Sequence, residues 1–131
     1  MDRSRAWWVG ANFLSRSGGR RMWTEYDASI VRQELRVLAE HGCSMTRSFC
    51  YWPDFVPEVQ KLDERMVARL KDFLDAHVEV GLGTIPTLIV GHMSGENWDP
   101  SWRRQRNLYT QEPPTLSIRP SLVIRTEAKG V

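Results

Sequence analysis

The chain has 131 residues, of which 41% are hydrophobic and 26% charged, and its formal net charge is +2. These values fit one globular domain, and the mild positive charge gives no electrostatic argument for a nucleic-acid partner. No apolar run approaches the ~20 residues that cross a membrane, and no hydrophobic region follows the charged N-terminus as in a signal peptide. We therefore expect a cytoplasmic protein without a membrane partner.

An apolar and aromatic segment, Ala6 to Leu14, predicts a first strand that ends near Asn12. After a loop with serines and glycines, Asp27 is a good N-cap for a first helix, and Gly42 suits its C-terminal end. The apolar stripe of this helix recurs at helical spacing and consists of Ala28, Val31, Leu35 and Leu38.

The second strand is expected at Ser44 to Tyr51, and a second helix from Asp63 to Gly81. The apolar stripe of that helix is Met66, Val67, Leu70, Phe73, Leu74 and Val78. The third strand is expected at Gly83 to Val90. Because Pro86 removes a backbone donor from it, this strand suits a bulge or an unpaired edge.

The alternation of strand and helix predicts an α/β fold with a parallel sheet. Bulky aromatic residues fill the loops that follow the strands, and these loops share one edge of such a sheet. The residues are Trp23, Tyr26, Trp52, Phe55, Trp98 and Trp102. The loop after the third strand adds polar groups, among them His92, Glu96, Asn97 and Asp99. This edge is therefore the candidate site.

Metal and cofactor motifs are absent from the sequence. Its three histidines (His41, His77 and His92) are scattered without ligand spacing, and no glycine-rich phosphate loop occurs. Cys43 and Cys50 lie too far apart along an extended segment to form a disulfide, so we expect two reduced core cysteines. The sequence thus indicates neither a metal nor another cofactor.

The last part of the chain changes character. Three prolines interrupt residues 111–131 and no helical stripe occurs there, although a third strand–helix unit should place its helix in this region. We expect a partial domain over residues 1–110 and an irregular or disordered tail over 111–131. One hypothesis is a frameshift after Tyr109, which reading the other two frames of the coding DNA would test.

Five segments of the chain carry a resemblance to a known family. They are Trp8-Val9-Gly10-Ala11-Asn12, Met22-Trp23, Gly42 through Phe49, Trp52-Pro53-Asp54-Phe55, and Pro86 through Trp102. Together they resemble the N-terminal part of glycoside hydrolase family 5, the cellulase and mannanase group of (β/α)₈ barrels, over residues 6–109. The resemblance implies about three βα units of a TIM barrel.

The resemblance also implies a retaining β-glycosidase that acts on β-1,4-linked mannan or glucan. Its acid/base glutamate would follow the fourth strand and its nucleophilic glutamate the seventh, so this chain holds neither catalytic carboxylate. Glu96 is not the acid/base, because Glu96-Asn97 reverses the family's Asn-Glu order and follows the third strand. We expect no catalytic residue in the chain and no hydrolysis by the chain alone.

Seven residues are candidates for binding an oligo- or polysaccharide. Arg47 falls on the family's strand-two arginine, which holds the nucleophilic carboxylate, and His92 falls on a histidine that lines the subsite nearest the cleaved bond. Without the family, Arg47 reads as a strand-end salt bridge and His92 as a structural residue. The remaining candidates are Asn12, Trp23, Trp52, Trp98 and Trp102, of which the tryptophans could stack on sugar rings or pack the loops.

Two other functions stay open at this point. One is a non-catalytic carbohydrate-binding protein or half-barrel that self-associates through the open edges of its sheet. The other is a truncated gene product without function.

Overall fold

The computed structural model describes residues 7–93 and 95–103. The expected tail at 111–131 and the domain boundary near residue 110 lie outside this part of the chain. In order, the elements are β1 (Gly10–Asn12), η2 (Gly19–Arg21), α1 (Ala28–Glu40), β2 (Met45–Tyr51), α2 (Trp52–Phe55), α3 (Glu64–Val80), β3 (Gly83–Val90), β4 (His92–Met93) and β5 (Glu96–Asn97).

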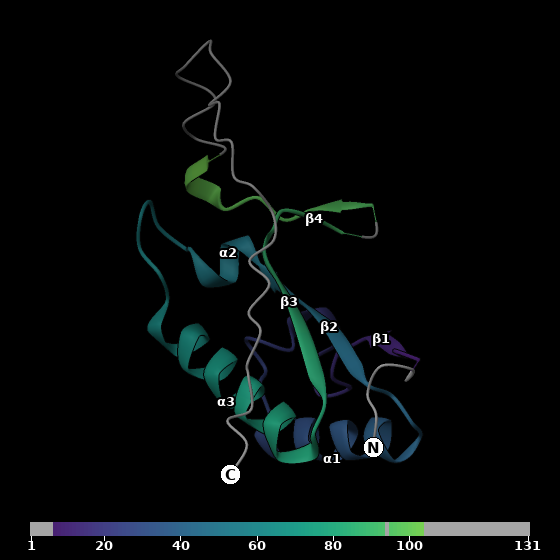
Figure 1. Cartoon of the computed structure of the whole chain (residues 1–131). Coiled ribbons are helices and arrows are strands. Elements are labelled where there is room, and N and C mark those ends of the chain that lie inside the picture. The colour runs from purple at the N-terminus through teal and green to yellow at the C-terminus, as the bar shows by residue number, and fades with distance from the viewer. Residues whose placement is uncertain (1–6, 94, 104–131) are drawn as a thin grey trace.

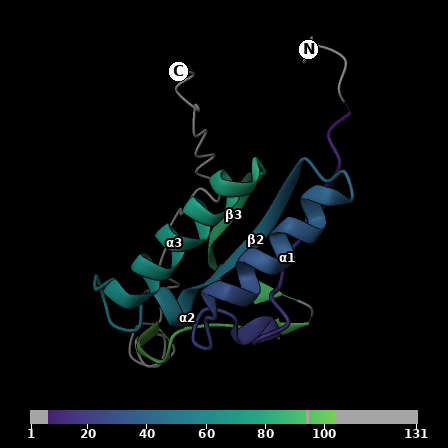
Figure 2. The same cartoon turned by 90° about the horizontal axis from the view of Figure 1, so that it is seen from below.

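β1, β2 and β3 form a parallel sheet in that order, which confirms the predicted α/β fold (Figure 1). Figure 2 shows that α1 and α3 cover the same face of this sheet. β4 and β5 form a separate antiparallel hairpin after β3. β1 ends at Asn12 as expected but begins only at Gly10, and Trp7 and Trp8 before it are exposed.

The helix ends follow the capping residues in the sequence. Asp27 and Asp63 each accept hydrogen bonds from two backbone N–H groups of the helix that they precede. The C-cap of α3 is Gly81, whose φ of 71° is a left-handed conformation that glycine adopts without steric cost. The C-cap of α1 is His41, and Gly42 after it has a φ of 84°.

The core lies between the sheet and the two helices. On β2 the helix-facing side chains are small, and Thr46, Ser48 and Cys50 are fully or almost fully buried. The largest buried side chains around them are Trp23, Tyr51, Phe73, Met22, Leu35, His77 and Val31. Two residues of the predicted α3 stripe do not belong to this core. Val67 and Val78 are exposed, and the buried residues of α3 are Met66, Phe73, Ala76 and His77.

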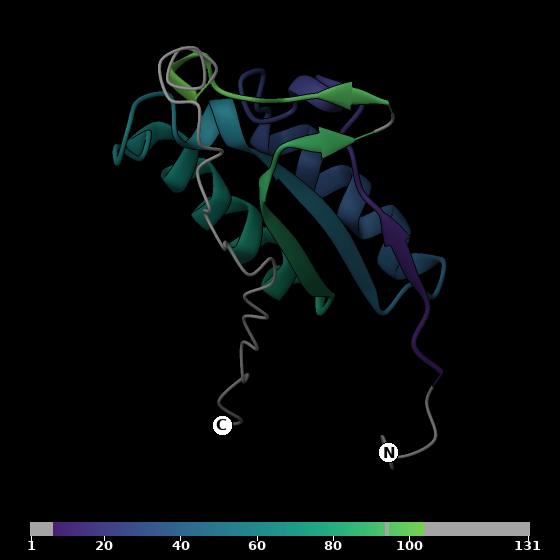
Figure 3. The same cartoon turned by 90° about the horizontal axis from the view of Figure 1, so that it is seen from above.

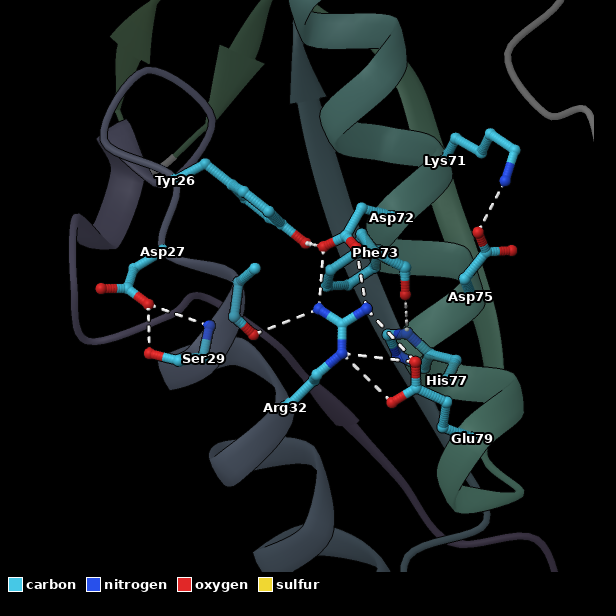
Figure 4. A network of polar contacts seen from close by, with 11 residues as sticks. Tyr26, Asp27, Ser29, Arg32, Lys71, Asp72, Phe73, Asp75, His77 and Glu79 are labelled. Atoms are coloured by element: carbon cyan, nitrogen blue, oxygen red, sulfur yellow. Dashed lines mark hydrogen bonds and ion pairs between the residues drawn. The ribbon is translucent and has the colours of Figure 1, made fainter.

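Ion pairs join the two helices along their outer side (Figure 4). Arg32 of α1 donates to Asp72 at 2.7 Å and to Glu79 at 3.1 Å, both on α3. The Tyr26 hydroxyl donates to Asp72 at 2.7 Å. Burial and the neighbouring carboxylate raise the pKa of Tyr26, so it stays a neutral donor. This network fixes α1 beside α3.

A second polar contact lies inside the core. His77 Nε2 and Thr46 Oγ1 are 2.7 Å apart, and His77 Nδ1 lies 2.8 Å from the Phe73 carbonyl oxygen. The carbonyl can only accept, so Nδ1 carries the proton and Nε2 accepts from the threonine hydroxyl. Burial lowers the pKa of His77, which keeps the ring neutral. His77 is thus a buried packing residue.

The third strand has the irregularity that Pro86 suggested, a few residues later. β3 is an edge strand among the described residues, and its register with β2 shifts between Phe49 and Tyr51. One extra residue of β3 is inserted there, and Ile89 takes a φ of 55°. A β-branched residue is strained in that conformation, and bulges of this kind re-aim the side chains at a strand end. The residues that follow, up to His92, enter the candidate site.

Candidate functional site

The loops after the three strands meet at one edge of the sheet, as predicted. In Figure 1, α2 and the β4–β5 hairpin lie together at the upper end of the strands, and Figure 3 looks onto this edge from above. The Trp98 N–H donates to the Gly91 carbonyl at 2.7 Å and closes the base of the hairpin. Short connections thus hold the third loop against the strand ends.

An aromatic pair forms the centre of this edge. The rings of Tyr51, at the end of β2, and Trp98 are 4.8 Å apart and tilted by 33°. The Arg20 guanidinium lies 5.9 Å from the Trp98 ring centroid and also donates to Glu96 at 2.7 Å. Arg20 therefore ties the first loop to the hairpin and covers part of the Trp98 ring.

His92, on the β4–β5 hairpin, is exposed, and a hydrogen bond fixes the orientation of its ring. His92 Nδ1 lies 2.8 Å from the Asn97 side-chain oxygen, its partner across the hairpin. Since that oxygen accepts, Nδ1 carries the proton in the neutral ring and Nε2 keeps a lone pair. A ligand hydroxyl could donate to that nitrogen.

A second aromatic pair lies beside the first. Trp52 and Trp102 meet edge to face, with ring centroids 5.8 Å apart. The Arg103 guanidinium lies 5.0 Å from the Trp52 ring centroid and pairs with Asp99. The Trp102 indole N–H donates to the Val56 carbonyl at 3.0 Å. Both indoles are half-buried, so each keeps part of its surface for contact with a ligand.

Arg47 and Asn12 lie on the sheet face opposite the helices. They are register partners on β2 and β1, and both are exposed. Arg47 Nε donates to the Thr87 hydroxyl at 3.0 Å, and its guanidinium lies 5.1 Å from the Phe49 ring centroid. A hollow of about 200 Å³ on this face is lined by Gly10, Ala11, Asn12, Met45, Thr46, Arg47 and Ile85. Among the described residues Arg47 has no ion pair, so the strand-end salt bridge is not formed there.

Trp23 requires a correction. It follows β1 as expected, but its side chain is fully buried among Tyr26, Phe55 and Phe73. Its indole N–H donates to the Phe49 carbonyl at 2.6 Å. A ring without exposed surface cannot stack on a sugar, so Trp23 belongs to the core.

Three residues at this edge were missed by the sequence reasoning. Tyr51 was taken only as a strand residue, although its ring packs on Trp98. Arg20 lies in the loop after β1, and its partner Glu96 lies 76 positions away in the chain. Asp54, at the start of α2, is partly buried, and this burial raises the pKa of its carboxyl group. Only the bulk of Tyr51 next to a strand end could have drawn attention to it.

Two features were looked for in the described part of the chain: a cluster of metal-binding side chains and a membrane-spanning helix. Within residues 7–93 and 95–103, no group of three or more His, Cys, Asp or Glu side chains could hold a metal ion. In the same part of the chain no helix combines the length and the apolar character needed to cross a bilayer. The described side chains at this edge offer hydrogen-bonding groups, such as His92 and Asn97, and aromatic surface.

No family model matches the chain, and no curated protein matches it. Solved structures do match. The exo-β-1,4-mannosidase Op5Man5 from Opitutaceae bacterium strain TAV5 is 39% identical over 72% of the chain, with a TM-score of 0.70. GH5_18 from Streptomyces cattleya, in complex with GlcNAc, is 31% identical over 81% of the chain, with a TM-score of 0.73. A GH5_18 variant from Bifidobacterium longum subsp. longum ATCC 55813, in complex with Manβ1-4GlcNAc, is 25% identical over 74%, with a TM-score of 0.70.

The described part of the chain is a GH5-like partial barrel. This confirms the family resemblance and the expected TIM-barrel architecture. The chain covers 17% of Op5Man5, 26% of the Streptomyces cattleya protein and 23% of the Bifidobacterium longum protein. The chain thus spans about a quarter or less of the length of the solved structures that it matches.

Proposed function

We propose that the chain forms the N-terminal wall of a carbohydrate site in a GH5-like hydrolase of β-1,4-linked mannosides. One observation carries this proposal. Side chains from three separate segments meet at one edge of the sheet, because Trp98, after the hairpin, packs on Tyr51 at the end of β2 and the Arg20 guanidinium of the first loop lies against Trp98. The named ligands and activity of the similar structures support a mannoside over a glucan.

Each residue has a distinct role in this proposal. His92 Nε2 accepts from a sugar hydroxyl, because Asn97 holds the ring through Nδ1. The terminal nitrogens of Arg47 are permanent donors for a hydroxyl or a carboxylate near the site. Trp98, Trp52 and Trp102 offer aromatic surface to the apolar faces of pyranose rings, and Asn12 binds a hydroxyl beside Arg47.

Hydrolysis is not expected of the chain alone. Hydrolysis that retains the anomeric configuration of the sugar needs two carboxyl groups about 5 Å apart. Glu96 is the carboxylate nearest His92 on the hairpin, and it is held in an ion pair with Arg20. The resemblance assigns both catalytic glutamates to later strands of the barrel. In this proposal the chain binds sugar but does not cut it.

Calorimetric titration of the purified chain with Manβ1-4GlcNAc tests the binding site. We expect binding that His92→Ala weakens about three- to tenfold, since it removes one hydrogen bond. Trp7→Ala is the matched control, because Trp7 is 92% exposed and precedes β1, away from the site. Cellobiose should bind more weakly. Equal affinity of wild type and His92→Ala would refute the proposed site.

A separate assay tests the absence of hydrolysis. Incubation of the chain with a chromogenic β-mannoside should release no chromophore above the buffer rate. Turnover at a rate typical of glycosidases would show that the carboxylates of this chain suffice for the reaction, and it would overturn the second half of the proposal.

A further inference from the structure

The loop between β1 and α1 holds one arginine against the β4–β5 hairpin (Figure 3). Arg20 of η2 donates to Glu96 of β5 at 2.7 Å, and its guanidinium lies 5.9 Å from the Trp98 ring centroid. The same arginine thus contacts both the second strand of the hairpin and the aromatic residue that follows it.

The segment that carries Arg20 is anchored in the core. Met22 and Trp23, two and three positions after Arg20, are fully buried. The Trp23 indole N–H also donates to the Phe49 carbonyl of β2 at 2.6 Å. Because close-packed neighbours enclose both side chains, the backbone of η2 has little freedom to move. The arginine therefore projects from a fixed base.

The hairpin has few residues with which to fix its own position. β4 and β5 have two residues each, and both residues of β5 are exposed. His92 is opposite Asn97, and Met93 is opposite Glu96. Since neighbouring side chains of a strand point to opposite faces, Met93 and Glu96 share one face, and His92 and Asn97 share the other. A hairpin this short is marginally stable by itself, so its position depends on contacts with the rest of the fold.

The face with Met93 and Glu96 makes such contacts. The Tyr51 hydroxyl donates to the Met93 sulfur at 3.7 Å, and the Tyr51 ring packs on Trp98 with the centroids 4.8 Å apart. Arg20 adds the ion pair with Glu96. The hairpin is thus held from β2 and from the first loop, while its opposite face presents the histidine of the candidate site.

We propose that Arg20 is a positioning residue of the carbohydrate site, which acts through Glu96 and Trp98 to hold the hairpin where His92 meets the sugar. This role rests on the proposed function, in which His92 accepts from a sugar hydroxyl. An arginine suits it because a planar guanidinium pairs with a carboxylate and also lies against an aromatic ring. The two side chains of the ion pair are 42% and 58% exposed, so its effect on affinity should be modest.

Four substitutions in the full chain test this role. Arg20→Ala and Glu96→Ala are made singly and together, and Arg20→Lys keeps the charge without the planar guanidinium. Arg21→Ala is the matched control, because Arg21 is also on η2 but pairs with Glu25 of its own loop at 3.1 Å.

Two quantities are measured for each variant. The first is the hydrogen-exchange rate of the Trp98 amide without sugar, because this N–H donates to the Gly91 carbonyl and closes the base of the hairpin. The second is the Kd for Manβ1-4GlcNAc, determined by calorimetric titration.

We expect Arg20→Ala to speed the exchange of the Trp98 amide and to weaken sugar binding, each about two- to fivefold, as for the loss of one exposed charged contact. The double variant should lose no more than Arg20→Ala, since both single substitutions break the same ion pair. Arg20→Lys should lie closer to wild type than Arg20→Ala, and Arg21→Ala should match wild type in both measurements.

Several results would overturn the role of Arg20. Unchanged exchange in Arg20→Ala would do so, as would faster exchange with unchanged affinity, or an Arg20→Lys variant no better than Arg20→Ala. Tighter binding by Arg20→Ala would also do so, because Arg20 would then be a cover over Trp98 that the sugar displaces. A wild-type chain that binds no sugar refutes the proposed function and this role with it, whereas wild-type binding without an Arg20 effect refutes this role alone.

Discussion

The two faces of the sheet differ in how far the described residues complete them. On the helix side, small residues of β2 such as Ser48 and Cys50 are buried beneath the two helices. On the other side, Arg47 is exposed and Phe49 half-buried. The helix face is therefore a finished core, and the opposite face is a surface without a cover in the described structure.

The side chains of β2 show why the two faces differ. The helices bring large groups, including Phe73 and His77, so the strand contributes small residues where it meets them. The opposite face carries larger groups, Met45 and Phe49, which match the layers that fill the interior of a (β/α)₈ barrel. Both faces of β2 are thus suited to packing against another layer, and α1 and α3 cover one of them.

The largest effect should come from the centre of the finished face. We expect Trp23→Ala to lower the free energy of unfolding by about 3–5 kcal/mol, because it empties a fully buried site and removes the hydrogen bond to the Phe49 carbonyl. Urea unfolding of the variant measures this. Trp7→Ala, at an exposed position, should stay within about 0.5 kcal/mol of wild type. A stable Trp23→Ala variant with weakened sugar binding would return Trp23 to the site.

The ion pairs between the helices should contribute less. Arg32→Ala removes the bonds to Asp72 and Glu79, whose side chains are partly exposed, and should cost about 1–2 kcal/mol. Arg36→Ala on the same helix is the control, since Arg36 is exposed. The loss for Arg32→Ala should shrink in high salt. Equal effects of the two substitutions would show that α1 and α3 are held by apolar packing alone.

The buried histidine predicts a dependence of stability on pH. Its pKa in the folded state is lowered, so below about pH 6.5 the unfolded chain binds a proton that the folded chain does not. The stability contributed by neutral His77 is present above that pH and is lost as the pH falls toward the folded pKa, by at most about 1.4 kcal/mol per pH unit. Urea midpoints of wild type and His77→Gln between pH 5 and pH 8 measure it. Parallel curves would contradict this role.

The sequence predicted the local features of the fold well. Asp27 and Asp63 are N-caps, and the third strand spans Gly83–Val90 as expected. Capping and turn residues act on their own backbone within a few positions, so the chain order reveals them. The edge at which the loops meet was also predictable, because parallel strands all end on the same side.

The features that the sequence did not predict depend on contacts between segments that are distant in the chain. The sequence could not tell a buried Trp23 from an exposed one, since both follow a strand and both are aromatic. The Arg20–Glu96 pair joins two loops that only the fold brings together. The bulge at Ile89 arises from the register between two strands. A positive φ is rare for a β-branched residue, so the sequence gives no indication of it.

The smallest effect should come from the uncovered face. Ile85 of β3 is 37% exposed on the side of Arg47, so Ile85→Thr should change the stability of the chain by less than about 0.5 kcal/mol. A similar exchange in the finished core, Val31→Thr, buries a hydroxyl and should cost about 1–3 kcal/mol. Urea unfolding compares the two variants. Equal losses would mean that the sheet face beside Arg47 is already covered in the isolated chain, and the contrast between the two faces would then disappear.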